Sequence, residues 1–315
     1  MLVRAFEERR GDVASETIWW LFEAADAWTR AGSLASAQAV LELAYRAARG
    51  GSEHAPDELQ WQRDLSVSHE RIGNVQVAQG DLASALESFK ASMAIRQRLA
   101  QSDPRNTLWQ RDLSVSHNKI GDVQVAQGDL ASALESFKAS MAIAQRLAQS
   151  DPRNTEWQRD LSVSHSKIGN VQVAQGDLAS ALESFKADMA IAQRLAQSDP
   201  RNTQWQRDLS ISHERIGDVQ VAQGDLASAL ESFKASMAIR QRLAQSDPRN
   251  TQWQRDLAVS AWKLGTFKAG MSVTERRDWL ARGLSIVEDM GGRGALSPAD
   301  AGMREQFRRA LDELD

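Results

Sequence analysis

Four histidines recur at a constant spacing of 48 residues: His69, His117, His165 and His213. An imidazole can ligate a metal ion or act as a general base near neutral pH, so such a ladder could carry metal or proton-transfer chemistry. Neighbouring helices of a stack, however, lie about 8–10 Å apart, which is too far for two rings to share an ion at about 2 Å. We therefore interpret the four histidines as partly buried, hydrogen-bonded structural side chains and expect no metal site.

The motif "WQRDL" offers two further kinds of chemistry. Its Arg63 and Asp64 recur in every copy, and they could either clamp an anion or form an ion-pair ladder between copies. We favour the ladder, in which each exposed pair contributes about 0–1 kcal/mol. The tryptophan of the motif could stack on nucleobases. Its place at the start of an apolar stripe instead predicts a core anchor, at Trp61, Trp109, Trp157, Trp205 and Trp253.

Sequence motifs of catalysis are not found. The chain has no cysteine, no Gly-rich phosphate loop with a following Lys, no H-E-x-x-H and no G-x-S-x-G. The "GGRG" that starts at Gly291 follows no predicted strand, and we interpret it as a flexible linker. The sequence therefore predicts a protein that is not an enzyme and that uses no cofactor.

Composition and charge narrow the classes of partner. Hydrophobic residues make up 42% and charged residues 25% of the chain, as in folded globular proteins. A net charge of -4 and a pI near 5.8 disfavour binding to nucleic acid or to an anionic membrane, both of which favour a basic face. We find no secretory signal and no apolar span of about 18 residues. A cytoplasmic protein is expected.

The elements that must position these residues form a repeat of 48 residues. Each copy has two segments with helical periodicity, about 61–79 and 82–101 in the first copy, joined by Gly80-Asp81 and closed by "SDPRN". Each copy is therefore predicted to be a helical hairpin. The pattern that starts at Thr107 and ends at Gln110 matches a capping box, which predicts the start of the next helix.

The spacing of a few small and aromatic residues gives the hairpin a family resemblance. Ile72-Gly73, Gly80, Ala85 and Phe89 match the tetratricopeptide repeat, although the family's Trp, Tyr and closing Pro positions hold other residues here and the copy is 14 residues longer than the family's 34. Phe89 is expected to pack beside Gly73. The resemblance implies an all-α fold, a right-handed superhelical α-solenoid of stacked helix-turn-helix repeats.

The phase of the repeat sets the expected organisation of one solenoid domain. Gly32, Ala37 and Leu41 keep the phase of a diverged first hairpin, which we expect to begin at about Val13. At the other end the phase slips by one residue, and a terminal helix from about Ser297 to Leu314 is expected to cover the last edge. The predicted segments are a diverged repeat at 1–56, four repeats at 57–104, 105–152, 153–200 and 201–248, and a degenerate repeat with a capping helix at 249–315.

Differences among the near-identical copies identify a candidate binding surface. On the first helix of each copy they fall on one stripe, and the resembled family usually binds its ligand along the concave wall made by these helices. We take the stripe to lie away from the packing face, so that charge reversal there should leave the fold intact. Drift of an exposed stripe is the alternative. The candidate residues are Val67, Glu70, Arg71, Asn74, Val115, Asn118, Lys119, Asp122, Val163, Ser166, Lys167, Asn170, Ile211, Glu214, Arg215 and Asp218.

Three functions remain open from the sequence. The first is a protein-interaction scaffold that presents a concave groove to a peptide or protein partner of mixed charge. The second is a sensing or regulatory array of a larger bacterial signalling or effector protein. The third is a self-assembling structural array, and a homo-oligomer is possible. On the second helices, the alternation of Arg96 and Arg240 with alanine in the other copies could mark the outer surface or a groove edge.

Overall fold

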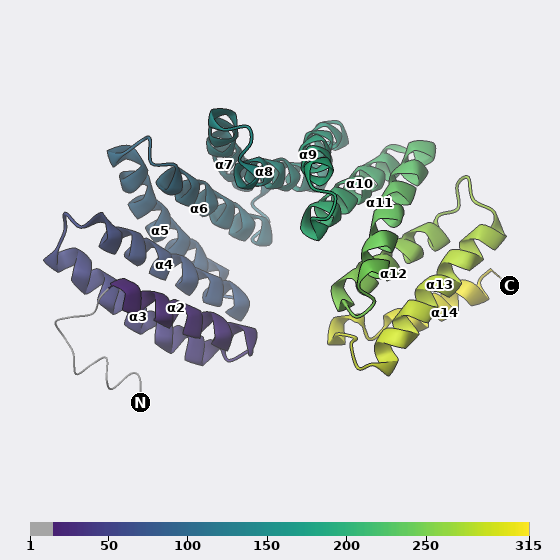
Figure 1. Cartoon of the computed structure of the whole chain (residues 1–315), viewed down its shortest axis with the longest axis horizontal. Helices are drawn as coiled ribbons and strands as arrows, with labels where there is room; N and C mark the ends of the chain where they lie inside the picture. The colour runs from purple at the N-terminus through teal and green to yellow at the C-terminus, as the bar shows by residue number, and fades with distance from the viewer. Residues whose placement is uncertain (1–14, 315) are drawn as a thin grey trace. The chain divides into compact units, whose positions relative to one another are not determined.

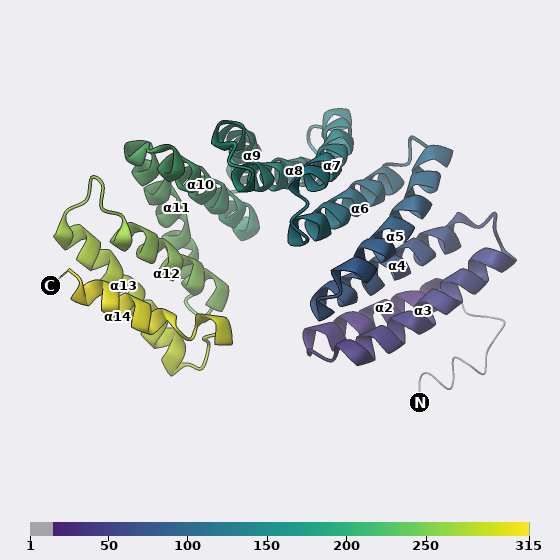
Figure 2. The same ribbon diagram turned by 180° about the vertical axis from the view of Figure 1, so that it is seen from behind.

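The computed structural model describes residues 15–314, and these residues form α-helices with no β-strand among them (Figures 1 and 2). The helices are α2 (Ser15–Arg30), α3 (Leu34–His54), α4 (Leu59–Gln79), α5 (Leu82–Ser102), α6 (Thr107–Ala126), α7 (Leu130–Ser150), α8 (Thr155–Ala174), α9 (Leu178–Ser198), α10 (Thr203–Gln223), α11 (Leu226–Ser246), α12 (Thr251–Thr266), α13 (Val273–Gly292) and α14 (Met303–Asp312), with a 3-10 turn at Pro298–Asp300.

The chain divides into two compact halves, Met1–Trp157 and Gln158–Asp315. In each half a helix packs chiefly on the helices next to it in the chain, so that hairpins stack on hairpins. The predicted all-α fold of stacked helix pairs is confirmed. No helix in the part of the chain that the structure describes is long and apolar enough to span a membrane.

The turn inside each hairpin is set by a glycine and an aspartate. Gly80 has a φ of 81°, the left-handed conformation that glycine adopts without a steric penalty, and it ends α4. Asp81 then caps α5 by accepting a hydrogen bond from the Ser84 amide at 3.0 Å. The same glycine and aspartate recur in the other three copies, so the residues of the turn itself determine the geometry of each hairpin.

The interior glycine of the first helix, Gly73, allows the two helices of a hairpin to approach each other closely. A Cβ added to Gly73 would lie 2.7 Å from a ring carbon of Phe89, and the Phe89 ring is only 2% exposed. Ala85 is fully buried beside it, and Ile120 of the next copy belongs to the same apolar cluster. The expected packing of Phe89 beside Gly73 is confirmed. One ring thus joins its own hairpin to the next one.

The first helix of a copy starts in a different way from the one predicted. Asn106 is the N-cap of α6, and its side chain accepts a hydrogen bond from the Trp109 amide at 3.2 Å, whereas Thr107 is the first helical residue. Gln110 does not close a capping box, because its side chain donates to the carbonyl of Ala100 at 2.9 Å. The capping-box prediction is wrong by one residue, and the glutamine ties a copy to the preceding one.

The first hairpin follows the predicted phase. α2 and α3 are joined at Gly32, which has a φ of 76°, and Ala25, Ala37 and Leu41 lie in the core at the expected positions. The expected start of this hairpin at about Val13 falls outside the described residues.

The last hairpin departs from the repeat and is followed by a short terminal helix. The segment from Ser297 is not one helix, because the 3-10 turn Pro298–Asp300 ends before Gly302 and α14 begins after it. Phe307 of α14 is 1% exposed and meets Trp262 edge-on at 5.1 Å between ring centroids. The first two glycines of "GGRG" are the end of α13 rather than a linker, and the turn comes at Gly294, with a φ of 65°.

Candidate functional site

The candidate residues lie on the first helices α4, α6, α8 and α10, on a surface that we call the first-helix face. Only four of them are exposed: Asp122, Val163, Asn170 and Asp218. Val67 and Ser166 are buried, and the others are half-buried. The stripe is therefore less open to solvent than the sequence suggested.

Polar bonds between successive copies explain much of this burial. Lys119 donates to Asn74 of the preceding copy at 2.8 Å, and Lys263 pairs with Asp218 at 2.6 Å. Arg71 pairs with Asp26 of α2 in the same way, and Arg215 donates to Ser166. The cations of the stripe thus hold neighbouring first helices together.

A buried ion pair lies behind the stripe. Arg96 of α5 is 3% exposed and pairs with Glu70 at 2.6 Å. It also donates to Ser116 Oγ at 3.0 Å and to the carbonyl of Asp112 at 3.2 Å, both in the next copy. Arg96 is therefore interior rather than on the outer surface, and it borders the hollow described below.

The pair is repeated in the fourth copy, where Arg240 contacts Glu214, Ser260 and the carbonyl of Asp256. Burial raises the pKa of Glu214, but the charges of Arg240 and Lys263 outweigh burial and lower it overall. The premise that Glu70 and Glu214 lie away from the packing face is wrong, because each carboxylate neutralises a buried arginine, and we now expect charge reversal there to destabilise the fold.

The sequence differences at these two positions are correlated, a signal that sequence reasoning missed. The copies with Arg96 and Arg240 have glutamates at the partner position, Glu70 and Glu214. The copies with alanine, Ala144 and Ala192, have the smaller and uncharged Asn118 and Ser166 there. Part of the sequence variation among the copies therefore has a structural cause: a copy has either both residues of the buried glutamate–arginine pair or neither of them.

Serines and one aspartate fill the same space in the two middle copies. Ser114 Oγ lies 2.8 Å from Ser140 Oγ, and both are buried. In the third copy Asp188 stands where the others have serine, and its carboxylate accepts hydrogen bonds from Ser162 and, at 2.9 Å, from Ser212. Burial raises the pKa of Asp188, and its two hydroxyl donors oppose that rise.

The Arg–Asp motif forms the expected ladder between copies. Arg63 Nε lies 3.0 Å from Asp112 Oδ2 of the next copy, and Arg159–Asp208 and Arg207–Asp256 repeat the pair at 2.8 and 2.6 Å. At the end of the described chain Asp300 takes the role of the next copy's aspartate, 2.8 Å from Arg255. The ion-pair interpretation is confirmed for these rungs.

The tryptophans and histidines are partly buried. All five repeat tryptophans are half-buried, and Trp61 packs against Gly51. The four histidines are also half-buried, and His69 meets Tyr45 edge-on at 5.1 Å between ring centroids. Burial lowers the pKa of each of the four histidines. Within residues 15–314 no three acidic, histidine or cysteine side chains gather into a metal-binding group.

These histidines should make stability depend on pH. Because their pKa values in the folded protein lie below the ordinary 6.5, the unfolded chain binds more protons as pH falls through that value, and the free energy of unfolding decreases. The loss should stop below the folded pKa values. We expect a variant with glutamine at all four positions to lose less stability between about pH 7.5 and 5, measured by urea denaturation at both values. An unchanged pH dependence would contradict this.

Several candidate residues come together in one hollow of the N-terminal half. The hollow has a volume of about 320 Å³ and lies against α2, α4 and α6. It contains acidic and basic groups beside apolar side chains, and four of its members, Trp19, Asp26, Arg96 and Asp112, are not among the predicted site residues. The lining residues are Trp19, Asp26, Val67, Glu70, Arg71, Asn74, Arg96, Asp112 and Val115.

Comparisons with known proteins bear on the fold. No family model matches the chain, and no curated protein matches it. The structure of BtubC from P. vanneervenii is similar, with a TM-score of 0.60 and 16% identity over 82% of this chain and 93% of that one. The apo form of RapI has a TM-score of 0.58 and 14% identity, over 94% of this chain and 99% of that one. A putative kinesin light chain of Podosopora anserina with nearly identical TPR-like repeats has a TM-score of 0.53 and 16% identity, over 75% of this chain and 99% of that one. The fold is therefore a TPR-like helical repeat.

Proposed function

We propose that this chain is a protein-interaction scaffold that binds a peptide or protein segment on the first-helix face and has no catalytic role. The observation that carries the proposal is the hollow against α2, α4 and α6. Five residues chosen from sequence differences line it: Val67, Glu70, Arg71, Asn74 and Val115.

The lining favours a partner of mixed charge. Three carboxylates and two guanidinium groups surround the hollow, and each arginine is already paired, Arg71 with Asp26 and Arg96 with Glu70. A partner can exchange bonds with the outer pair, in which the Asp26 side chain is 41% exposed. Contacts with such exposed groups weaken as salt is added, since the Debye length falls to about 8 Å at 0.15 M.

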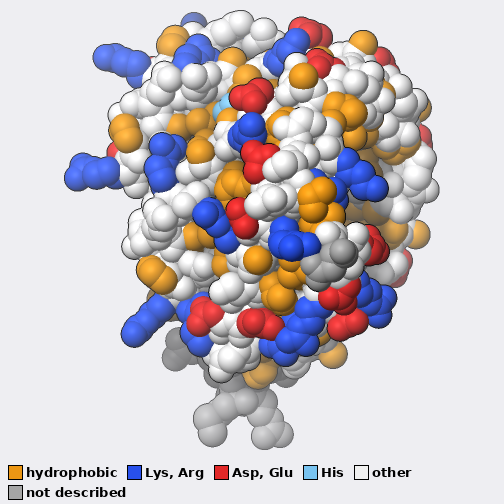
Figure 3. Space-filling model, turned by 90° about the vertical axis from the view of Figure 1, so that its right-hand side faces the viewer, with side chains coloured by type: hydrophobic (Ala, Val, Ile, Leu, Met, Phe, Trp, Pro, Cys, Tyr) orange, Lys and Arg blue, Asp and Glu red, His pale blue; other side chains and the backbone are white. Residues whose placement is uncertain are grey.

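Figure 3 shows the side of the molecule that lies at the right in Figure 1, where acidic and basic side chains are interspersed over the surface. Such a surface lacks the broad positive field that captures nucleic acid or an anionic membrane. On this side of the molecule, the mixed charges favour a protein partner over nucleic acid or an anionic membrane.

The proposal can be tested by filling the hollow. Val115 is half-buried at its edge, and Val115→Trp would place an indole in it. We expect the purified array to capture partner proteins from a lysate and the Val115→Trp array to lose those proteins, as measured by quantitative mass spectrometry.

The matched control is Ala142→Trp, which adds the same indole at an exposed position of α7. Circular dichroism should show both variants folded. Loss of the same proteins from both variants, or from neither, would contradict a binding role of the hollow.

A further inference from the structure

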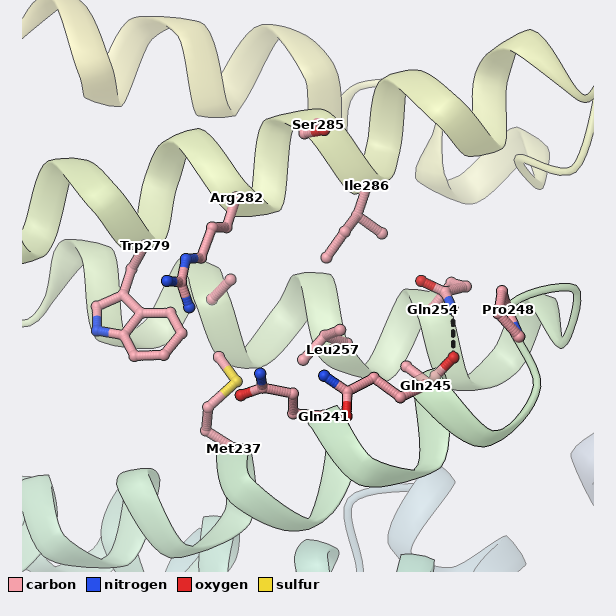
Figure 4. A pocket seen from close by; sticks show the side chains of 12 residues that line it. Met237, Gln241, Gln245, Pro248, Gln254, Leu257, Trp279, Arg282, Ser285 and Ile286 are labelled. Carbon is pink, nitrogen blue, oxygen red and sulfur yellow. Dashed lines mark hydrogen bonds between the residues drawn. The ribbon is translucent and has the colours of Figure 1, made fainter.

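A second cavity lies in the C-terminal half and involves second helices. It has a volume of about 440 Å³ and lies between α11 and α13, over α12. Figure 4 shows side chains of α11 and α13 on opposite sides of the cavity, with Leu257 of α12 between them. The volume is in the range of pockets that hold ligands, about 300–1,000 Å³.

The cavity exists because a conserved ring of the repeat is missing at this joint between hairpins. Ala261 stands where each of the four copies has histidine. At the first joint the corresponding side chains are His69 and Tyr45, whose rings meet at 5.1 Å. At the last joint Ala261 and Met237 take these places and both line the cavity. Every later copy has methionine at the Tyr45 position, so the last joint differs from the others by one missing ring, that of the histidine, and this leaves the space open.

The walls combine an apolar floor with polar groups at the rim. Met237 and Ala261 are buried, and Leu257, Trp279 and Ile286 are half-buried. The Arg282 guanidinium lies over the Trp279 ring, 5.0 Å from its centroid. No carboxylate pairs with Arg282 among the side chains described, so its charge is available to a ligand.

Two glutamines extend the rim along α11. Gln241 and Gln245 line the cavity, and their amides can both donate and accept hydrogen bonds. Met237 and Gln245 are eight residues apart on one helix, a span of about 12 Å at 1.5 Å per residue. That length corresponds to about four residues of extended chain, which favours a peptide segment as the occupant.

We propose that this cavity binds an extended segment of a partner protein in which a bulky apolar side chain stands next to an acidic one. The apolar side chain occupies the floor over Ala261, and the carboxylate pairs with Arg282. The glutamine amides bond to the peptide main chain. The proposal goes beyond the first-helix face, because every lining residue lies in the C-terminal half.

The test uses the full chain with its methionine methyl groups labelled with ¹³C and a tetrapeptide, acetyl-Glu-Phe-Glu-Gly amide. We expect a saturable shift of the Met237 methyl signal, identified by its loss in Met237→Leu. The peptide with alanine for phenylalanine should bind at least about tenfold more weakly, since the floor then has no apolar partner. Arg282→Glu should reverse the preference in favour of acetyl-Lys-Phe-Lys-Gly amide.

The decisive variant is Ala261→His, which restores the residue of the four copies and should fold. It should abolish the saturable shift. Equal peptide binding by Ala261→His, or no saturable shift with the unaltered chain, would overturn the proposal. A Met237 shift that depends on protein concentration alone would also overturn it, because the cavity would then hold a second copy of the chain. Ala261→His leaves the N-terminal hollow intact, so failure here is distinguishable from failure of the proposed function.

Discussion

Replacing Phe137 with alanine is expected to lower the free energy of unfolding by about 3–5 kcal/mol. The ring is 2% exposed and packs against Gly121 of its own hairpin. Its counterpart Phe89 packs in the same way against Gly73, so loss of the Phe137 ring leaves a cavity between the two helices of its own hairpin. The measurement is urea denaturation of the full chain.

The glycine beneath the ring provides a sharper test, because two effects oppose each other there. Alanine is favoured over glycine in a helix by about 1 kcal/mol, but a Cβ at Gly121 would lie 2.5 Å from a Phe137 ring carbon. We expect Gly121→Ala to destabilise by about 1–3 kcal/mol through overpacking. In the Phe137→Ala background the same change should become stabilising.

The control is Gly50→Ala in α3, where an added Cβ meets no atom within 4 Å. This change should stabilise the chain by about 0.5–1 kcal/mol. If Gly121→Ala stabilised the chain as much as Gly50→Ala does, the close approach of the two helices would be wrong.

Removal of the Glu70 carboxylate is expected to cost about 3–5 kcal/mol, because Glu70→Ala leaves the Arg96 charge buried without its counter-ion. The Arg96 side chain is 4% exposed, and its remaining contacts are hydroxyls and a carbonyl, which carry no full charge. The change in the urea midpoint measures this cost. Lys90→Ala on the same hairpin, where an exposed lysine pairs with Glu87, should change the midpoint little.

The chain itself contains the change that should restore stability. The second copy has Asn118 and Ala144 at these two positions, so the double variant Glu70→Asn with Arg96→Ala reproduces a pair of residues that already occurs in the chain. Ser92 Oγ, buried and without a partner beside Arg96, could then bond to Ser66 as Ser140 bonds to Ser114. A double variant as unstable as Glu70→Ala would contradict the coupling.

Local features of the hairpin could be predicted from the sequence because they depend on neighbours along the chain. The turn at Gly80, the contact of Phe89 with Gly73 and the Arg63–Asp112 rung all follow from one copy placed against the next. The N-cap was misplaced because Asn106 and Thr107 are both good capping residues, and only the backbone decides between them.

The exposure of the stripe could not be predicted from helical periodicity alone. Periodicity places Glu70 and Asn74 on one side of α4, but it does not show that Arg96 and Lys119 reach that side from other helices. Long cationic side chains cover surface well away from their own backbone. The pairing of glutamate with arginine among the copies was present in the sequence and would have indicated one of these contacts.

The location of the buried pair within a single copy has a consequence for how such a gene can change. Glu70 and Arg96 both fall in 57–104, and the groups that Arg96 meets in the next copy, a serine and a main-chain carbonyl, occur in every copy. Addition or deletion of a whole 48-residue copy therefore does not separate the arginine from its glutamate. A change in the number of hairpins is compatible with the pair, whereas joining the first helix of one copy to the second helix of a copy of the other kind would leave one charge in the interior without its counter-ion.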